Sequence, residues 1–178
     1  MNPRLHGFTL VELMVALAIL AILLAIAAPS YRDFVVDSRM SGEANEFLTG
    51  LNLARSEAVK RNRPVSMCKS GNGTGCANSG DWEQGWIVFV DLPAGTIGSF
   101  DSGTDTILRV HAALNEQSTL VGTTNVEDYV SFVPDGRSQL AGGGAQAGTF
   151  DLCTAGATVP GRRITLALGR ASAAKIAC

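Results

Sequence analysis

Histidine and charged residues are scarce in this sequence. Two histidines, His6 and His111, occur in 178 residues, so few side chains are suited to bind a metal or to move a proton near neutral pH. The 14 basic and 16 acidic residues leave a net charge of -2, which excludes a protein that binds polyanions over its whole surface. Apolar residues make up 46% of the chain and charged residues 17%, a balance that excludes an intrinsically disordered chain.

Recognisable signatures of catalysis are also missing. The glycines at 142–144 lack the lysine and the helix that follow a phosphate-binding loop. His111 lies in an expected strand among alternating apolar residues, a position more typical of cross-strand packing than of an acid–base catalyst. We therefore expect no catalytic residue, no metal site and no cofactor, and a protein that is not an enzyme.

Charge is sparsest near the N-terminus. The 21 residues from Phe8 to Ala28 carry one charged side chain, Glu12. As a helix, this run is ~31 Å long, about the thickness of the hydrocarbon core of a bilayer. An ordinary signal peptide is the alternative interpretation. The run is long for one, has no small-residue cleavage site, and contains a carboxylate that is costly inside a membrane without a partner.

The segment around this acid resembles a known processing signal. Gly7-Phe8-Thr9-Leu10-Val11-Glu12 resembles the class III signal of type IV pilins and type II secretion pseudopilins. The resemblance implies that a prepilin peptidase cleaves after Gly7, removes residues 1–7 as a leader and methylates Phe8. In a dry filament core Glu12 needs a positive partner, and the new Phe8 amine of a neighbouring subunit can provide it. Glu12 is thus expected to act in assembly.

The apolar run is expected to continue into a longer helix. Pro29 follows it directly and marks either a membrane exit or a kink. Downstream, apolar side chains recur at spacings of three and four residues: Phe34, Val35, Met40, Ala44, Phe47, Leu48, Leu51 and Ala54. The charged residues Arg39, Glu43 and Glu46 are expected largely off that stripe. The pattern predicts one helix from near Phe8 to about Arg61, with its second half lying on a globular head.

After Pro64 the pattern changes to short β-rich runs separated by turn residues. The expected strands are Val65–Cys68, Gly85–Asp91, Thr106–Ala113, Tyr129–Val133, Thr149–Cys153, Arg163–Leu168 and Ser172–Cys178. The compact apolar run Trp86–Val90 is expected at the centre of a sheet, and the last two strands are expected to turn at Gly169-Arg170. Trp82 and Trp86 are interpreted as core residues rather than as a binding platform.

The order of these head segments is similar to that of the GspH/FimT group of minor pilins and pseudopilins. The matching segments are 54–58, 80–86 and 132–137. The implied fold is α+β and type IV pilin-like, with a long N-terminal helix packed on an antiparallel β-sheet head. The implied domains are a leader at 1–7, a transmembrane and filament-core helix at 8–28, an amphipathic continuation at 29–62 and the head at 63–178.

The head contains all four cysteines: Cys68, Cys76, Cys153 and Cys178. A head outside the inner membrane favours disulfides, and the absence of a C-x-x-C pair argues against zinc. Four cysteines allow three pairings. The Gly-rich loop between the first two favours Cys68–Cys76 and Cys153–Cys178, but the other pairings stay open.

The chain ends in a basic stretch. No acidic residue follows Asp151, and the basic residues there are Arg162, Arg163, Arg170 and Lys175. These side chains could bind the phosphates of double-stranded DNA without reading its sequence, or they could simply guard the edge of a sheet. Some FimT-type pilins act as DNA receptors and carry a glycine–arginine–any–arginine signature. Here Ser172 replaces the second arginine after Gly169-Arg170, which departs from that signature.

The resemblance implies a minor pilin that is incorporated into, or primes assembly of, a type IV pilus used in twitching motility, adhesion or DNA uptake. Its expected partners are other pilins, the prepilin peptidase and the inner membrane. It would span the bacterial inner membrane once and then move to the pilus, in the periplasm and at the cell surface. The alternatives are a DNA-binding pilin of natural transformation and a minor pseudopilin of type II secretion.

Overall fold

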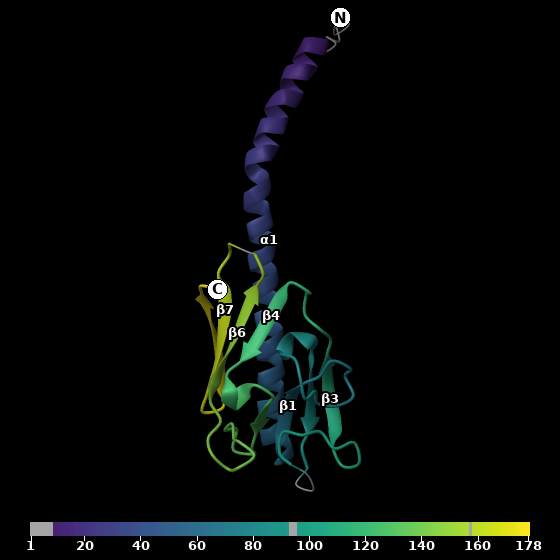
Figure 1. Cartoon of the computed structure of the whole chain (residues 1–178), viewed down its shortest axis with the longest axis vertical. Coiled ribbons are helices and arrows are strands. Elements are labelled where there is room, and N and C mark those ends of the chain that lie inside the picture. Colours follow the sequence, from purple (N-terminus) through teal and green to yellow (C-terminus); the bar gives the residue numbers. More distant parts are fainter. Residues whose placement is uncertain (1–8, 93–95, 157) are drawn as a thin grey trace, which may run out of the picture.

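One long helix organises the molecule. The computed structural model describes residues 9–92, 96–156 and 158–178, without the side chains of 26–30. Helix α1 (Leu10–Arg61, 52 residues) has Thr9 as its N-cap and Asn62 as its C-cap. Asn62 has a φ of 51°, the left-handed conformation that commonly ends an α-helix. Its N-terminal half extends away from the head, and its C-terminal half packs against the head (Figure 1). The predicted single helix is confirmed over these bounds, while Phe8 lies outside the described residues.

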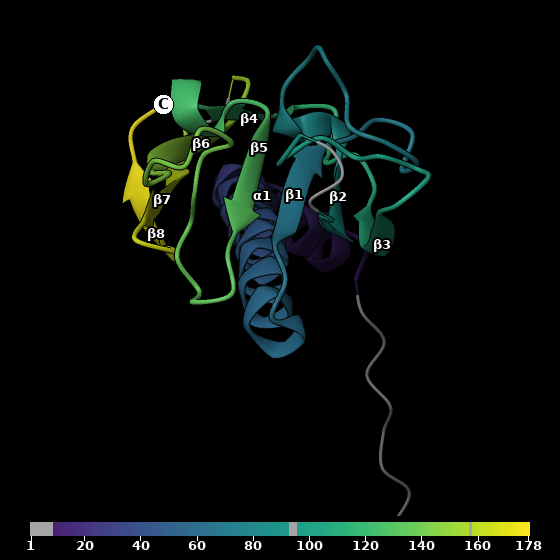
Figure 2. The same ribbon diagram turned by 90° about the horizontal axis from the view of Figure 1, so that it is seen from below.

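Among the described residues, the head contains two antiparallel sheets of four strands each. The first has the order β3 (Thr106–His111), β2 (Trp86–Val90), β1 (Val65–Lys69), β5 (Tyr129–Phe132). The second has the order β4 (Ser118–Gly122), β6 (Gly148–Thr154), β7 (Gly161–Ala167), β8 (Arg170–Ile176). The short 3-10 helices η1 (Trp82–Gln84) and η2 (Thr124–Val126) connect strands. From below, the two sheets lie side by side across α1 (Figure 2).

Two details of the strand prediction are wrong. Strand β4 was not expected, because its sequence STLVG holds only two large apolar residues. In the structure, only Leu120 of these two is buried. The last hairpin turns at Leu168-Gly169 rather than at Gly169-Arg170, since Ala167 pairs with Arg170. Both turn residues have positive φ, 50° and 76°, as a two-residue type I′ turn requires. Arg170 is therefore the first residue of β8 and not the tip of the hairpin.

The core forms where α1 meets both sheets. The helix residues buried there recur at alternating spacings of four and three: Met40, Ala44, Phe47, Leu51, Ala54 and Ala58. Phe47 packs edge-on against Trp82, Trp86 and Phe150, with ring centroids 5.3, 5.1 and 4.7 Å away. The indole N–H of Trp82 donates to the carbonyl of Val126 at 3.0 Å, so this buried donor is satisfied. Both tryptophans are core residues, as expected.

The buried stripe of α1 is shorter and more polar than predicted. Phe34 and Val35 are exposed, at 70% and 46%, because the head begins to cover the helix only after them. Glu43, expected off the stripe, is buried, and its carboxylate accepts a hydrogen bond from the Ser118 hydroxyl at 2.7 Å. That bond to β4 compensates for burying the acid.

Two disulfides join the pairs that the sequence analysis favours. Cys68 in β1 is bonded to Cys76 in the following loop, and Cys153 in β6 is bonded to the C-terminal Cys178. The second bridge holds the segment after β8 against β6. Gly161 makes room for it, because a Cβ there would collide with the Cys178 sulfur.

Candidate assembly site

The N-terminal half of α1 presents apolar side chains to solvent on all sides. Between Leu10 and Leu24, the large ones that are more than half exposed are Leu10, Val11, Leu13, Met14, Val15, Leu17, Ile19, Leu20, Ile22, Leu23 and Leu24. An apolar surface of this extent on a single chain marks a site that other molecules cover. Within the described residues, no helix combines the length and the apolar character needed to cross a membrane. The expected run at 8–28 includes Phe8 and the side chains of 26–28, which lie outside the described residues.

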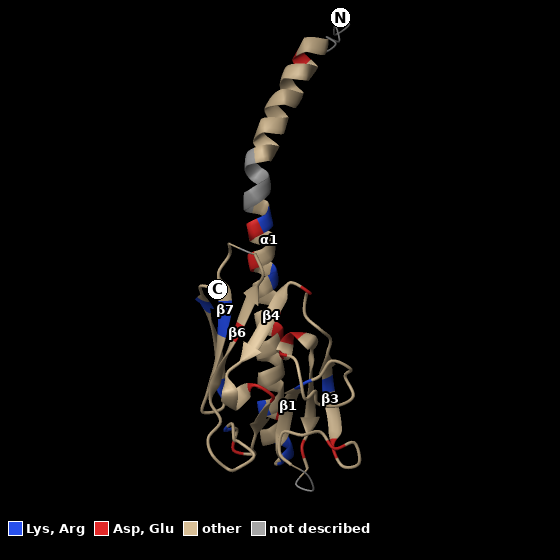
Figure 3. Cartoon of the chain, viewed as in Figure 1, with Lys and Arg blue, Asp and Glu red and all other residues tan. Residues whose placement is uncertain are grey.

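Glu12 lies in the first turn of this helix. Its backbone N–H donates to the Thr9 hydroxyl at 3.2 Å, which fixes the start of α1 at that point. Glu12 is exposed among the exposed apolar residues of this half of α1, which carries little charge along its length (Figure 3). A negative charge near a helix N-terminus is also favoured by the helix dipole. Gly7 and Phe8, the predicted processing residues, lie outside the described residues.

A cluster of hydrogen bonds holds α1 to the second sheet where the helix leaves the head. The Arg162 guanidinium on β7 donates to the Asp37 carboxylate at 2.8 Å, to the Ser41 hydroxyl at 2.9 Å and to the carbonyl of Pro160 at 2.8 Å. Lys175 on β8 lies 3.5 Å from the other oxygen of the same carboxylate. The hydrogen bond from Arg162 holds the pKa of Asp37 below its usual value, with a smaller contribution from Lys175. We call Arg162, Asp37, Ser41 and Lys175 the helix clamp.

The clamp corrects the interpretation of the basic C-terminal stretch. Arg162, a candidate phosphate ligand from the sequence, is buried, and its guanidinium is bonded to protein groups rather than exposed to solvent. Arg163, the next residue, points to the opposite face of the sheet and forms a two-bond pair with Asp151, at 2.7 and 2.6 Å. That pair lowers the pKa of Asp151. The strand alternation places Arg170 on the same outer face as Arg163, so the four predicted residues do not form one surface.

Sequence reasoning missed Asp37 and Ser41 entirely. Both lie more than 120 positions from Arg162 in the chain, and nothing in their local pattern signals a partner. His111 also has a structural role in the described fold. Its ring stacks on Trp86 with a centroid distance of 3.9 Å, and its Nε2 lies 3.0 Å from the Glu46 carboxylate.

Comparison with known families agrees with this geometry. The model described as "Type II transport protein GspH" matches residues 43–170, which is most of the chain. The chain belongs to the GspH family. A second model, the prokaryotic N-terminal methylation motif, matches residues 3–28 and so covers Gly7, Phe8 and Glu12.

Fimbrial proteins and pilins are among the curated relatives that match this GspH-family chain. Fimbrial protein EcpC of Eikenella corrodens is 56% identical over 51 residues, which are 29% of this chain and 33% of EcpC. The type IV major alpha-pilin of Moraxella bovis is 37% identical over 65 residues, or 36% of this chain and 40% of that pilin. The chain thus spans less than half the length of these two relatives.

Solved structures extend the likeness to the whole fold. The type IV minor pilin FimU of Pseudomonas aeruginosa matches 78% of this chain and 90% of its own, with a TM-score of 0.57 and 24% identity. A second crystal form of FimU covers 75% of this chain and 91% of its own, with a TM-score of 0.53 and 25% identity. The GspH-family chain has the fold of a type IV pilin, as predicted, and both the family and the fold are those of structural subunits.

Proposed function

We propose that this chain is a minor pilin that is built into, or primes, a type IV pilus. The observation that carries the proposal is the exposed apolar stretch Leu10–Leu24 of α1 with its single carboxylate, Glu12, in the first turn of the helix. Neighbouring pilin helices would cover the apolar surface in the filament. The N-terminal methylation motif supports prior cleavage after Gly7 by a prepilin peptidase, with the precursor anchored in the bacterial inner membrane.

The role of Glu12 follows from electrostatics. Once neighbouring helices exclude water, its carboxylate requires a cationic partner, and cleavage creates one at the Phe8 amine of the next subunit. Because both charges are fixed near the helix N-terminus, their pairing would set the axial register of neighbouring subunits. Partners in this proposal are therefore other pilins, and the mechanism is non-covalent assembly.

The test is incorporation of the full-length chain into pili of its own host. Glu12→Gln removes the charge but keeps the shape, and it should lower the amount of the protein in sheared pili about tenfold relative to the membrane fraction. Glu116→Gln, which neutralises an exposed acid on the head, is the matched control and should leave incorporation unchanged. Equal incorporation of the Glu12→Gln and wild-type chains would contradict the register role. Absence of the wild-type chain from pili would contradict the proposal itself.

A minor pseudopilin of type II secretion is the second candidate. The family description, which refers to type II transport, favours it. Deleting the gene distinguishes the two: loss of pili or twitching supports the pilin, and loss of protein secretion with normal pili supports the pseudopilin.

DNA reception is the remaining alternative from the sequence. With Arg162 in the helix clamp, the cations left for it on one face are Arg163 and Arg170. Binding of short duplex DNA that weakens with salt and is lost in an Arg163→Gln/Arg170→Gln variant would support this alternative.

A further inference from the structure

The turn between β7 and β8 has an unusual residue at its first position. Among the described residues, two that are not glycine have a positive φ, Asn62 and Leu168. Asn62 ends α1, a place where asparagine is common. Leu168 has a φ of 50° in a type I′ turn, where asparagine or glycine is favoured because a larger Cβ side chain is strained.

Burial in the core does not offset the backbone strain at Leu168. Its side chain is 75% exposed, the highest value among the large apolar residues described. The turn cannot easily relax either, because Gly169 lies so close to the carbonyl of Gly136 that a Cβ would collide with it. A strained and exposed leucine in a fixed turn points to an interaction that selects it, since folding alone does not.

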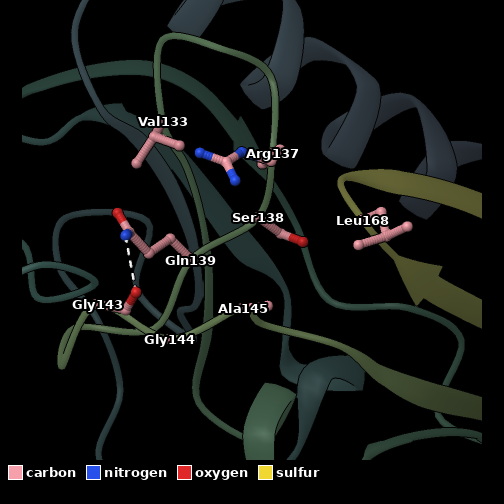
Figure 4. A pocket seen from close by; sticks show the side chains of 8 residues that line it. All are labelled: Val133, Arg137, Ser138, Gln139, Gly143, Gly144, Ala145 and Leu168. Atoms are coloured by element: carbon pink, nitrogen blue, oxygen red, sulfur yellow. Dashed lines mark hydrogen bonds between the residues drawn. The ribbon is translucent and has the colours of Figure 1, made fainter.

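Leu168 belongs to a wider surface around the β7–β8 turn, and this turn lies toward the end of the head away from the free half of α1 (Figure 1). It lines a cavity of about 180 Å³ together with Val133, Arg137 and the Gly143–Ala145 loop, and Figure 4 shows it across that cavity from the loop residues. Gly136, which precedes the lining residue Arg137, links this cavity to the end of α1, because a Cβ on Gly136 would lie 3.3 Å from both the Arg55 Nε and a Val59 methyl. We call this surface, made of Val59, Val133, Leu168, Arg55, Arg137 and Arg170, the distal patch.

The charges of the distal patch indicate the chemistry of its partner. Arg137 is paired with Asp135 at 2.6 Å. Within the described chain, neither Arg55 nor Arg170 has an acidic group at ion-pair distance. Arg55 donates its Nε–H to the carbonyl of Gly136 at 2.9 Å, which orients the guanidinium without neutralising it. The patch therefore combines an apolar anchor with uncompensated positive charge.

We propose that the distal patch docks on the head of a different, neighbouring pilin, which presents an apolar site flanked by carboxylates, with Leu168 as the central anchor. This inference rests on the proposed pilin function and adds a second contact, remote from Glu12. DNA fits the patch less well, because phosphates offer no apolar surface to Leu168. A copy of the same patch also fits less well, because it would bring Arg55 and Arg170 against like charges.

The decisive variant is Leu168→Asn in the full-length chain, expressed in its own host. Because Asn-Gly suits a type I′ turn, the melting temperature should rise above that of the wild type. Because the anchor is lost, incorporation into sheared pili should fall at least roughly fivefold. A substitution that only damaged the fold would lower both the melting temperature and the incorporation. A higher melting temperature together with lower incorporation therefore identifies a lost interaction. The control Val121→Thr alters an apolar side chain that is 47% exposed on β4, away from the patch, and should leave incorporation unchanged.

A photo-crosslinking amino acid at position 168 identifies the partner. The expected product joins position 168 to a different pilin, at a peptide with Asp or Glu beside apolar residues, and the Arg170→Glu variant should reduce its yield. Wild-type incorporation of Leu168→Asn would overturn the inference while the pilin function stands. Crosslinks to a second copy or to DNA would overturn it in favour of those partners. If the wild-type chain is absent from pili, the proposed function fails first, and the inference that rests on it fails as well.

Discussion

At the scale of single residues, Asp91 is the buried acid whose ionisation is costly. It is 2% exposed, and one carboxylate oxygen accepts hydrogen bonds from the Ser66 hydroxyl and the Gly98 N–H, both at 2.7 Å. Burial raises the pKa of Asp91, and the nearby Asp105 adds to the rise. A folded-state pKa above the unfolded value of about 3.9 gives stability that is present below that value and is lost as pH rises through the folded pKa.

We predict that Asp91→Asn raises the melting temperature at pH 7 by a few degrees. The amide oxygen can accept both hydrogen bonds, while the buried charge is removed. The gain should shrink as the pH is lowered toward 4, where the wild-type carboxyl becomes protonated. Thermal unfolding monitored by circular dichroism at several pH values measures this. The exposed Glu116→Gln serves as the control, and a lower melting temperature for Asp91→Asn at pH 7 would contradict the prediction.

The sequence predicted which residues are buried wherever the signal is local. The burial of Trp82 and Trp86 and the apolar stripe around Phe47 follow from residue type and spacing. The bond from Ser118 to Glu43 spans 75 positions, and the bond from Arg162 to Asp37 spans 125. Such partners depend on which strands lie against α1 and in what register, and a single sequence does not contain that information in any local pattern.

At the scale of elements, the two disulfides act on different parts of the head. Cys68–Cys76 closes a loop of eight residues beside β1, and Cys153–Cys178 closes one of 25 residues that contains β7 and β8. Strand β8 is at the edge of its sheet, pairs with β7 alone and has mostly exposed side chains. The Cys153–Cys178 bridge therefore attaches the end of edge strand β8 covalently, in addition to its pairing with β7 and its contact in the helix clamp.

We predict that the double variant Cys153→Ala/Cys178→Ala lowers the free energy of unfolding by about 3.5 kcal/mol, the chain-entropy value for its loop. Backbone amides of β8 should exchange hydrogen faster, because the C-terminal end of the edge strand is free to fray. Cys68→Ala/Cys76→Ala, with a chain-entropy value of about 2.5 kcal/mol, should leave exchange in β8 unchanged. Urea unfolding and hydrogen exchange provide the two measurements. Unchanged β8 exchange in the first variant would show that the clamp alone holds the strand.

Helices and strands were predicted correctly where their apolar pattern is long or compact, and strand β4 was missed because its apolar pattern is weak. Helix α1 and strand β2 have long or compact apolar patterns, and their bounds in the structure are close to those expected. Strand β4 has five residues and is positioned by pairing with β6, not by its own apolar content. The last hairpin turn was predicted one residue too late, because leucine rarely occupies turns and Leu168 therefore gave no turn signal.

At the scale of the whole molecule, the relation between the free half of α1 and the head determines how the protein can enter a filament. The general architecture was predictable, because a motif at the N-terminus and the order of the head segments both resemble pilins. The division of the head into two sheets, and the clamp that joins the second sheet to α1, were not. Arg162 bonds to the helix at Asp37, just before the first fully buried residue of α1, Met40, so the clamp lies where the free half of the helix begins.

We therefore predict that Arg162→Gln loosens the helix from the head and that Arg163→Gln does not. Both variants remove one positive charge from β7. Arg162 is buried and bonded to α1, whereas Arg163 is exposed and paired with Asp151 inside the sheet. Loss of the charged hydrogen bonds of Arg162 should destabilise the head by about 2 kcal/mol, while loss of the exposed Arg163 pair should have a much smaller effect, because solvent screens exposed charges.

Hydrogen exchange of the full chain in detergent micelles locates the effect. In Arg162→Gln, amides at 33–41 should exchange faster, while those of β2 in the first sheet keep wild-type rates. Because the lowered pKa of Asp37 belongs to this pair, its contribution to stability is present above the unfolded pKa of about 3.9 and is lost as pH falls through the folded value. Acidification should therefore loosen 33–41 in the wild type and in Arg163→Gln, and have less effect in Arg162→Gln. Equal exchange at 33–41 in all three chains at pH 7 would mean that the apolar stripe alone fixes the helix on the head.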